Sequence, residues 1–163
     1  MSAQPPIDYI QRTRDQYASL GYAPYQWVHA GEPPPFTQLT KPVADSKLSL
    51  IASGGIYLEG QVAFHFKDDS SYRKIDVDAP ASKRRATHFA YDLDDARQDI
   101  NVVFPVDTLK RMVSKGKLGA LAQQAYTFMG GIYSTRKVET ILAPAIADRV
   151  VADEVDLALL VPA

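Results

Sequence analysis

Residues 47–55 have the sequence KLSLIASGG, an apolar run that ends in two glycines. Its apolar residues are consecutive rather than alternating, which predicts a strand from Lys47 to Ala52 that is buried on both faces, as in a parallel sheet. Gly54 and Gly55 predict a tight turn with positive φ directly after this strand. Ligands of open α/β sheets bind beyond the carboxyl ends of the strands, so the turn could also bring backbone N–H groups to an anionic ligand. The sequence leaves both interpretations open.

Strand and helix patterns alternate along the rest of the chain, without an internal repeat. This alternation predicts the α/β class, with a mostly parallel sheet flanked by helices in a flavodoxin-like or Rossmann-like arrangement. The other predicted elements are an extended piece at Tyr72–Val77, a strand at Asn101–Phe104, a helix from Val106 capped by Gly116, a short helix and a strand or turn within residues 117–134, a helix at Thr135–Val151 that Pro144 kinks or splits, and a last strand at Asp156–Val161.

The N-terminal part of the chain has a different composition. A helix is predicted from Pro6 to Leu20, with Gly21 as its stop. The following residues are rich in proline and cannot form a regular helix, so we expect an extended arm or lid. Its aromatic residues, Tyr22, Tyr25 and Trp27, are expected to pack on the domain or on a partner. The predicted domains are therefore residues 1–46, a helix with a proline- and aromatic-rich arm, and residues 47–163, the α/β domain.

Composition argues against several classes of function. A formal net charge of −1 over 163 residues gives no electrostatic case for nucleic acid or an anionic membrane. There is no apolar run long enough to span a membrane and no signal-peptide pattern, so a cytoplasmic location is expected. The chain has no cysteine, which excludes a disulfide, a thiolate zinc site or a cysteine nucleophile within it. His29, His65 and His88 have no metal-binding spacing, so no metal site is predicted.

Five stretches from residue 48 onward carry a specific pattern: LSLIASGGIYLEGQ, DDSSYRKI, THFAYDLDDARQDINVVFPVDTLKRM, GKLGALAQQAYTFMGGI and DEVDLALLVPA. In their order and spacing they resemble the selenoprotein B family of the glycine, sarcosine, betaine and D-proline reductases. The resemblance covers more than two thirds of the chain. Its most specific part is NVVFPVDTL, followed by GALA and the closing VDLALLVP.

The resemblance implies a reactive group that this sequence does not contain. In that family the last strand runs into a U-x-x-C or C-x-x-C motif at the start of a helix, where free N–H groups and the helix dipole stabilise the chalcogen anion. It implies a selenocysteine or redox cysteine just after Ala163, with a UGA codon misread as a stop. The implied activity is reductive C–N cleavage of an amino-acid-type small substrate by a selenolate or thiolate, for which the 163-residue form is not competent alone.

The same resemblance implies partners: further reductase subunits, a thioredoxin-like electron donor and an oligomeric assembly. The alternative is a chalcogen-free structural or small-molecule-binding subunit without catalysis. Both interpretations predict the same fold, so fold alone does not separate them.

His88 and Arg73 are the candidate residues with side-chain chemistry. His88, in THFAYD, matches a segment on the substrate side of the related reductases and could donate a proton to a leaving amine, or it could be an ordinary structural histidine. Arg73, in SSYRKI, matches the family's serine–aromatic–arginine segment and could bind a substrate carboxylate through its fork of N–H donors. Ser70 precedes it as a turn former and a secondary substrate-binding candidate.

The remaining candidates are more ambiguous. Met129 and Gly130 open a second glycine turn, MGG, which could also contact a ligand through its backbone or could only serve packing. His65 lies between two phenylalanines and is predicted to be a strand residue. The basic run at residues 83–85 is predicted to be a solvated face.

Overall fold

The computed structural model describes residues 8–163 with the exception of residues 25, 27 and 90. Tyr25, Trp27 and the predicted helix start at Pro6 therefore lie outside the described residues. The chain divides into two compact units, Met1–Phe36 and Thr37–Ala163, which are described one at a time.

The N-terminal unit contains one helix, α1 (Tyr9–Ser19), among its described residues. The carboxylate of Asp8 accepts a hydrogen bond from the Gln11 amide at 2.9 Å and caps the helix start. Gly21, at φ +75°, ends the helix as predicted. The ring of Tyr22 lies 6.0 Å from that of Tyr17, within the same unit.

The second unit is built on a mixed sheet whose centre is β1, the strand predicted from the apolar run. Parallel pairs join β1 to β5, β6 and β7, and an antiparallel pair joins β3 to β6. A separate antiparallel pair joins β2 and β4. The strands are β1 (Lys47–Ala52), β2 (Ile56–Leu58), β3 (Tyr72–Asp76), β4 (Arg84–Ala86), β5 (Ala120–Leu121), β6 (Gln124–Phe128) and β7 (Leu157–Val161).

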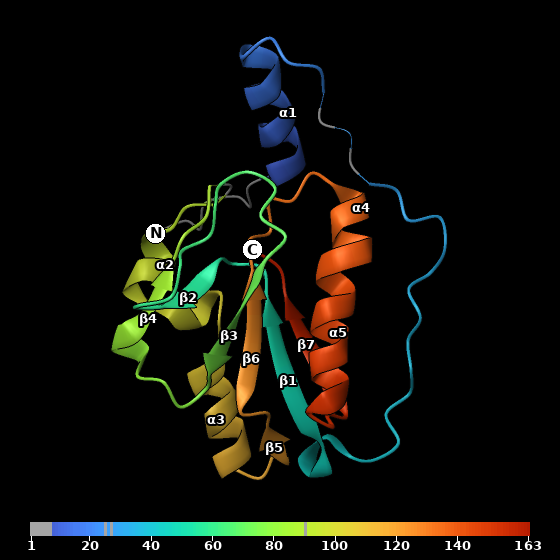
Figure 1. Cartoon of the computed structure of the whole chain (residues 1–163), viewed down its shortest axis with the longest axis vertical. Helices are drawn as coiled ribbons and strands as arrows, with labels where there is room; N and C mark the ends of the chain where they lie inside the picture. The colour runs from blue at the N-terminus through green and yellow to red at the C-terminus, as the bar shows by residue number, and fades with distance from the viewer. Residues whose placement is uncertain (1–7, 25, 27, 90) are drawn as a thin grey trace, which may run out of the picture. The chain divides into compact units, whose positions relative to one another are not determined.

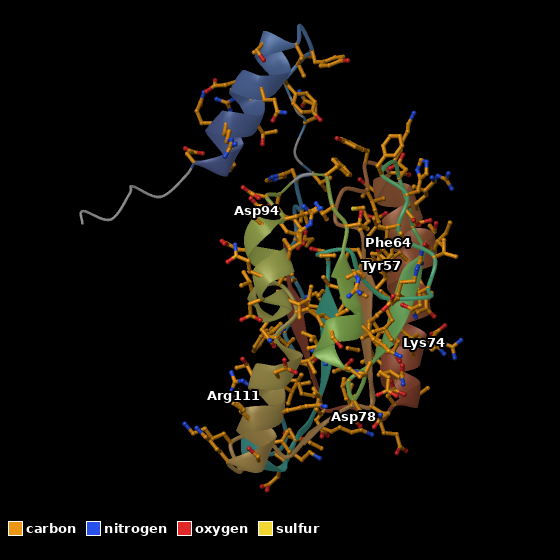
Figure 2. All side chains as sticks on the ribbon, turned by 90° about the vertical axis from the view of Figure 1, so that its left-hand side faces the viewer. Tyr57, Phe64, Lys74, Asp78, Asp94 and Arg111 are labelled. Atoms are coloured by element: carbon orange, nitrogen blue, oxygen red, sulfur yellow. The ribbon has the colours of Figure 1, made fainter. Side chains whose placement is uncertain are left out.

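Helices cover both faces of this sheet (Figures 1 and 2). On one face α3 packs against β1 in a core that includes Leu50, Phe104 and Leu109. On the other face Leu142 and Ile146 pack against Tyr126 of β6. The α/β class with a mostly parallel sheet and flanking helices is therefore confirmed, whereas the strand pairing does not establish a flavodoxin-like or Rossmann-like topology.

The helical elements of this unit are η1 (Val43–Asp45), η2 (Ala81–Lys83), α2 (Asp94–Gln98), η3 (Ile100–Val102), α3 (Val106–Ser114), α4 (Thr135–Lys137), the π-helical turn η4 (Val138–Leu142) and α5 (Ala143–Ala152). Throughout the described part of the chain, no helix has both the length and the apolar character that crossing a membrane requires.

The strand predicted at Asn101–Phe104 is wrong, because these residues form the 3₁₀ turn η3 and the approach to α3. Side chains at the turn override the strand propensity of its valines. The Asp99 carboxylate accepts a hydrogen bond from the Asn101 amide at 3.0 Å. The Asn101 side chain in turn accepts one from the Asp107 amide at 3.0 Å and caps the first turn of α3.

The short helix predicted within residues 117–134 is also absent, since β5 and β6 occupy this part of the chain. A Cβ at Gly119 would lie 2.7 Å from the carbonyl carbon of Asp45, so the glycine lets two backbone segments touch. This contact packs η1 against the start of β5.

The predicted C-terminal helix is confirmed as a continuous helical segment made of α4, η4 and α5. Its hydrogen-bonding pattern changes to the π-helical turn η4 directly before α5, and Pro144 lies in the first turn of α5. Proline has no N–H to donate, so the change in pattern falls where the regular hydrogen bond cannot form. The predicted cap at Gly116 is confirmed, with φ +65° after α3.

The Arg84–Asp107 pair generates a stability prediction. The side chain of Arg84 is 1 % exposed, and the Asp107 carboxylate lies 3.2 Å from its terminal nitrogen. The other carboxylate oxygen accepts a 2.9 Å hydrogen bond from Asn101. An amide has only one acceptor oxygen and no charge, so Asp107→Asn is expected to lower the free energy of unfolding by about 1–3 kcal/mol at pH 7.

The pH dependence of that loss follows from the same contacts. The hydrogen bond from Asn101, followed by Arg84, holds the pKa of Asp107 below its ordinary 3.8 against the effect of burial. A lowered carboxyl pKa stabilises the fold above the unfolded-state pKa, and this contribution disappears as the pH falls through the folded-state pKa. Urea denaturation is expected to show the full difference above about pH 5 and a shrinking one below about pH 3. Glu32→Gln is the control, because Glu32 is an exposed carboxylate. A difference in unfolding free energy between wild type and Asp107→Asn that stays the same at low pH would contradict the assigned role of the Asp107 carboxylate.

Candidate functional site

The segments that follow β1, β6 and β7 lie together at one end of the sheet (Figure 1). Parallel pairing brings the carboxyl ends of these strands to the same edge. Hydrogen bonds continue past the strand ends: the Gly55 amide donates to the Phe128 carbonyl at 3.0 Å, and the Gly130 amide donates to the Ser53 carbonyl at 2.9 Å. The two predicted glycine turns are therefore interleaved, with Gly54 bridged to Met129.

Gly55 is required to be glycine for two separate reasons. Its φ of +67° lies in the region that side chains disfavour, and a Cβ there would lie 1.9 Å from the carbonyl oxygen of Thr87. The Thr87 amide also donates to the Gly55 carbonyl at 3.1 Å. The tight turn predicted from the sequence is confirmed, and it fixes the backbone immediately before His88.

His88 lies at the centre of this arrangement. It is 9 % exposed, and its ring lies 4.6 Å from the Tyr91 ring, centroid to centroid. A Cβ at Gly130 would lie 3.2 Å from His88 Nε2, 3.2 Å from the Ala163 carbonyl oxygen and 3.2 Å from the Ser53 carbonyl oxygen. Three strand-end segments and the imidazole thus meet at one point.

Burial lowers the pKa of His88 below its ordinary value of 6.5, because the low-dielectric surroundings disfavour the imidazolium. The ring is therefore mostly neutral at pH 7. A neutral imidazole can accept a proton through one nitrogen and donate through the other, which suits acid–base work.

Two residues that the sequence did not single out complete the site. The Ser53 hydroxyl oxygen accepts a 2.9 Å hydrogen bond from the Ala163 amide and so fixes the backbone after β7. Tyr91 packs on the His88 ring, and its hydroxyl donates to the Gly54 carbonyl at 2.9 Å. Ser53 could have been found because it directly follows the first strand, whereas the Tyr91 contact depends on the fold.

Arg73 lies on β3, and its guanidinium is engaged within the chain. It donates to the Val62 carbonyl at 2.7 Å, the Ala63 carbonyl at 3.3 Å, the Ser71 hydroxyl at 2.8 Å and the Tyr72 carbonyl at 3.1 Å. The same group lies 4.2 Å from the ring centroid of Phe64, which is labelled in Figure 2. These contacts leave a single N–H donor for a ligand.

The loop around Arg73 is shaped by its own side chains. The Asp69 carboxylate accepts hydrogen bonds from the backbone amides of His65 at 2.8 Å and Ser71 at 2.9 Å, which supports the prediction of turn-forming residues beside Ser70. Ser70 itself is half-buried in this loop.

Two of the other predicted positions, His65 and Arg84, differ in the structure. His65 lies in the loop between β2 and β3 rather than in a strand, where its ring stacks on Phe66 at 4.6 Å. Arg84 is 5 % exposed, so the basic run is not a fully solvated face: its middle residue is paired with Asp107. The side chain of Met129 is 1 % exposed, so only its backbone borders the site. His29 is exposed in the N-terminal unit.

Within the described ranges no group of three or more histidine, cysteine, aspartate or glutamate side chains is arranged to hold a metal ion. The strand-end site consists of an imidazole, a hydroxyl, a phenol and backbone groups. This set can position a small polar molecule and move a proton.

Comparison with known proteins identifies the family. The family described as glycine/sarcosine/betaine reductase selenoprotein B matches residues 32–163. The chain belongs to this family. The match includes β1, β6, β7 and the segment of His88, so the whole strand-end site lies within it.

The D-proline reductase subunit gamma of Acetoanaerobium sticklandii is 32 % identical over 128 residues, which cover 78 % of this chain and 53 % of the relative. The glycine reductase complex component B subunit gamma of Peptoclostridium acidaminophilum is 28 % identical, over 74 % of this chain and 28 % of the relative. The corresponding subunit of Carboxydothermus hydrogenoformans is 29 % identical, with the same coverage of 74 % and 28 %. The chain thus spans about half or less of the length of these relatives. No solved structure matches it significantly.

The Gly55 contact can be tested by a matched pair of substitutions. Gly55→Ala combines a positive φ with a backbone clash, and it is expected to cost roughly 3 kcal/mol or more of unfolding free energy. Gly116→Ala has nearly the same φ, +65°, with nothing within 4 Å, so about 1 kcal/mol is expected. Urea denaturation followed by circular dichroism gives both values, and equal losses would contradict the close approach of Thr87.

Proposed function

We propose that this chain forms the N-terminal part of a selenoprotein B-type reductase subunit that acts on an amino-acid-type or related small substrate. Membership of the family supports a reductase-subunit role. The observation that carries the finer proposal is that His88 Nε2 and the Ala163 carbonyl oxygen each lie 3.2 Å from the position of a Cβ at Gly130, at the carboxyl end of three parallel strands.

In this proposal the reactive selenocysteine or cysteine follows Ala163 in the longer gene product. The residues present fit such a group, because Ser53 fixes the Ala163 amide and the nearby imidazole is buried. A selenol or thiol there would supply the nucleophile and the reducing electron pair.

The chain's own residues have narrower tasks. His88, neutral at rest, takes up a proton on its ring and, as the imidazolium, passes it to the neutral amine that is released when the C–N bond breaks. The turns at Gly54–Gly55 and Met129–Gly130 shape the floor of the site. Arg73 remains a secondary candidate for the substrate carboxylate through its remaining N–H.

Partners are part of the proposal. Two relatives are named as components of a glycine reductase complex, and a third as a subunit of D-proline reductase. We therefore propose that the protein works with further reductase subunits and a thioredoxin-like electron donor, in an oligomeric assembly in the cytoplasm.

The nucleotide sequence after codon 163 tests the placement of the chalcogen. We expect an in-frame UGA or cysteine codon, a second cysteine codon three positions after it and an open frame that encodes a helix. A UAA or UAG codon, or a UGA with no open frame behind it, would contradict the proposal and favour a structural or small-molecule-binding subunit, which the absence of cysteine in these residues would fit.

Catalysis by His88 is tested in the full gene product, assembled with its partner subunits. His88→Gln keeps a hydrogen-bonding side chain but cannot titrate, and it is expected to lower kcat about 10²- to 10⁴-fold and to abolish the dependence of kcat on His88 protonation. His65→Gln, in the loop between β2 and β3, is the matched control and is expected to retain wild-type kcat. A His88→Gln enzyme with wild-type kcat and pH profile would remove His88 from the chemistry.

A further inference from the structure

The loop after β6 has a second glycine, and an aromatic ring occupies the place of its missing side chain. A Cβ at Gly131 would lie 2.2 Å from Cζ and 2.4 Å from Cε1 of Phe89. These separations are far below van der Waals contact, so the tip of the ring fills the volume that any other residue at position 131 would need. Phe89 is therefore seated in a notch that glycine alone leaves open.

The seated ring lies beside the candidate catalytic group. The ring centroids of Phe89 and His88 are 5.6 Å apart, and the ring planes differ by 13°. Phe89 nevertheless remains 46 % exposed, although burial of a large apolar side chain is favourable. The fold thus holds an aromatic surface open to solvent at the rim of the strand-end site.

We propose that Phe89, seated on Gly131, is a specificity-determining residue that presents its ring to the cationic amine of the substrate. This inference rests on the proposed function. Proline and glycine, which appear in the names of the relatives, carry a protonated amine at neutral pH. The face of an aromatic ring attracts a cation within about 6 Å of its centroid.

The Phe89 ring and the neighbouring His88 imidazole favour a cation over a neutral ligand. A phenylalanine offers no hydrogen bond, so an analogue with a neutral oxygen in place of the amine gains no electrostatic attraction from it. The buried imidazole of His88 is mostly neutral at pH 7 and adds no repelling positive charge.

The test is a binding measurement on the full gene product by isothermal titration calorimetry, without a reductant. Two probe pairs differ only in the cationic group: D-proline against (R)-tetrahydrofuran-2-carboxylate, and glycine betaine against 3,3-dimethylbutanoate. In at least one pair the cation is expected to bind more tightly to the wild type. Phe89→Leu keeps an apolar side chain but removes the π face, and it is expected to weaken binding of that cation about 3- to 30-fold while leaving its neutral analogue nearly unchanged.

Gly131→Ala tests whether the missing side chain at position 131 is what allows the Phe89 ring to take its position. The atoms closest to the added methyl group are the far end of an exposed side chain, so the ring must move while the backbone can remain in place. The variant is expected to reproduce the selective loss seen with Phe89→Leu, with a melting temperature within about 2 °C of the wild type. Gly31→Ala, which adds a methyl group with nothing within 4 Å, is the matched glycine control. Phe66→Leu removes another ring stacked on a histidine and is the aromatic control.

The inference is overturned if neither cation binds more tightly than its neutral analogue, or if Phe89→Leu weakens both members of a pair equally or neither. These outcomes are separate from failure of the proposed function. Cation selectivity that depends on Phe89, in a protein without reductive turnover, would retain the inference and remove the reductase assignment. Reductive turnover together with binding that does not distinguish the cation from its neutral analogue would retain the reductase assignment and overturn the inference about Phe89.

Discussion

The backbone contact between Gly55 and Thr87 is the constraint on which the site depends. The Thr87 carbonyl oxygen lies 1.9 Å from the position that a Cβ at residue 55 would take, so the chain after β1 touches the chain that leads into His88. Hydrogen bonds from Gly55 to Phe128, the last residue of β6, and from Ala163 to Ser53 join the other two strand ends to the same point. The position of the imidazole therefore follows from these backbone contacts.

These backbone contacts explain how a site with few reactive side chains can bring together groups suited to binding and proton transfer. The strand ends bring backbone, hydroxyl and imidazole groups together, while burial keeps His88 neutral at pH 7. Three glycines leave room for a neighbouring group that a Cβ would crowd. Gly55 leaves room for the Thr87 carbonyl, Gly130 for the His88 ring and the carbonyls of Ser53 and Ala163, and Gly131 for the Phe89 ring. In the proposed function the protein thus contributes geometry and proton transfer, and the redox group comes from the longer gene product.

The sequence predicted those features that depend on local pattern. The consecutive apolar residues of β1 required burial on both faces, and Gly54–Gly55 required a turn. The sequence-based prediction failed where side-chain contacts determine the local structure. Asn101–Phe104 has the composition of a strand, but hydrogen bonds of Asn101 with Asp99 and Asp107 make this segment the approach to α3. Two of the carbonyls that engage Arg73, those of Val62 and Ala63, lie eleven and ten residues away in the chain, so a composition argument could not find them.

The most direct measurement is an NMR titration of the His88 ring in the wild-type protein, with His88→Gln used to assign the signal. The buried position at the junction of three strand ends predicts a pKa below the ordinary value of 6.5 and a neutral ring at pH 7. A pKa at or above 6.5 would place the imidazole in solvent or beside a negative charge. That result would contradict the arrangement from which the site, the proposed function and the role of Phe89 are derived.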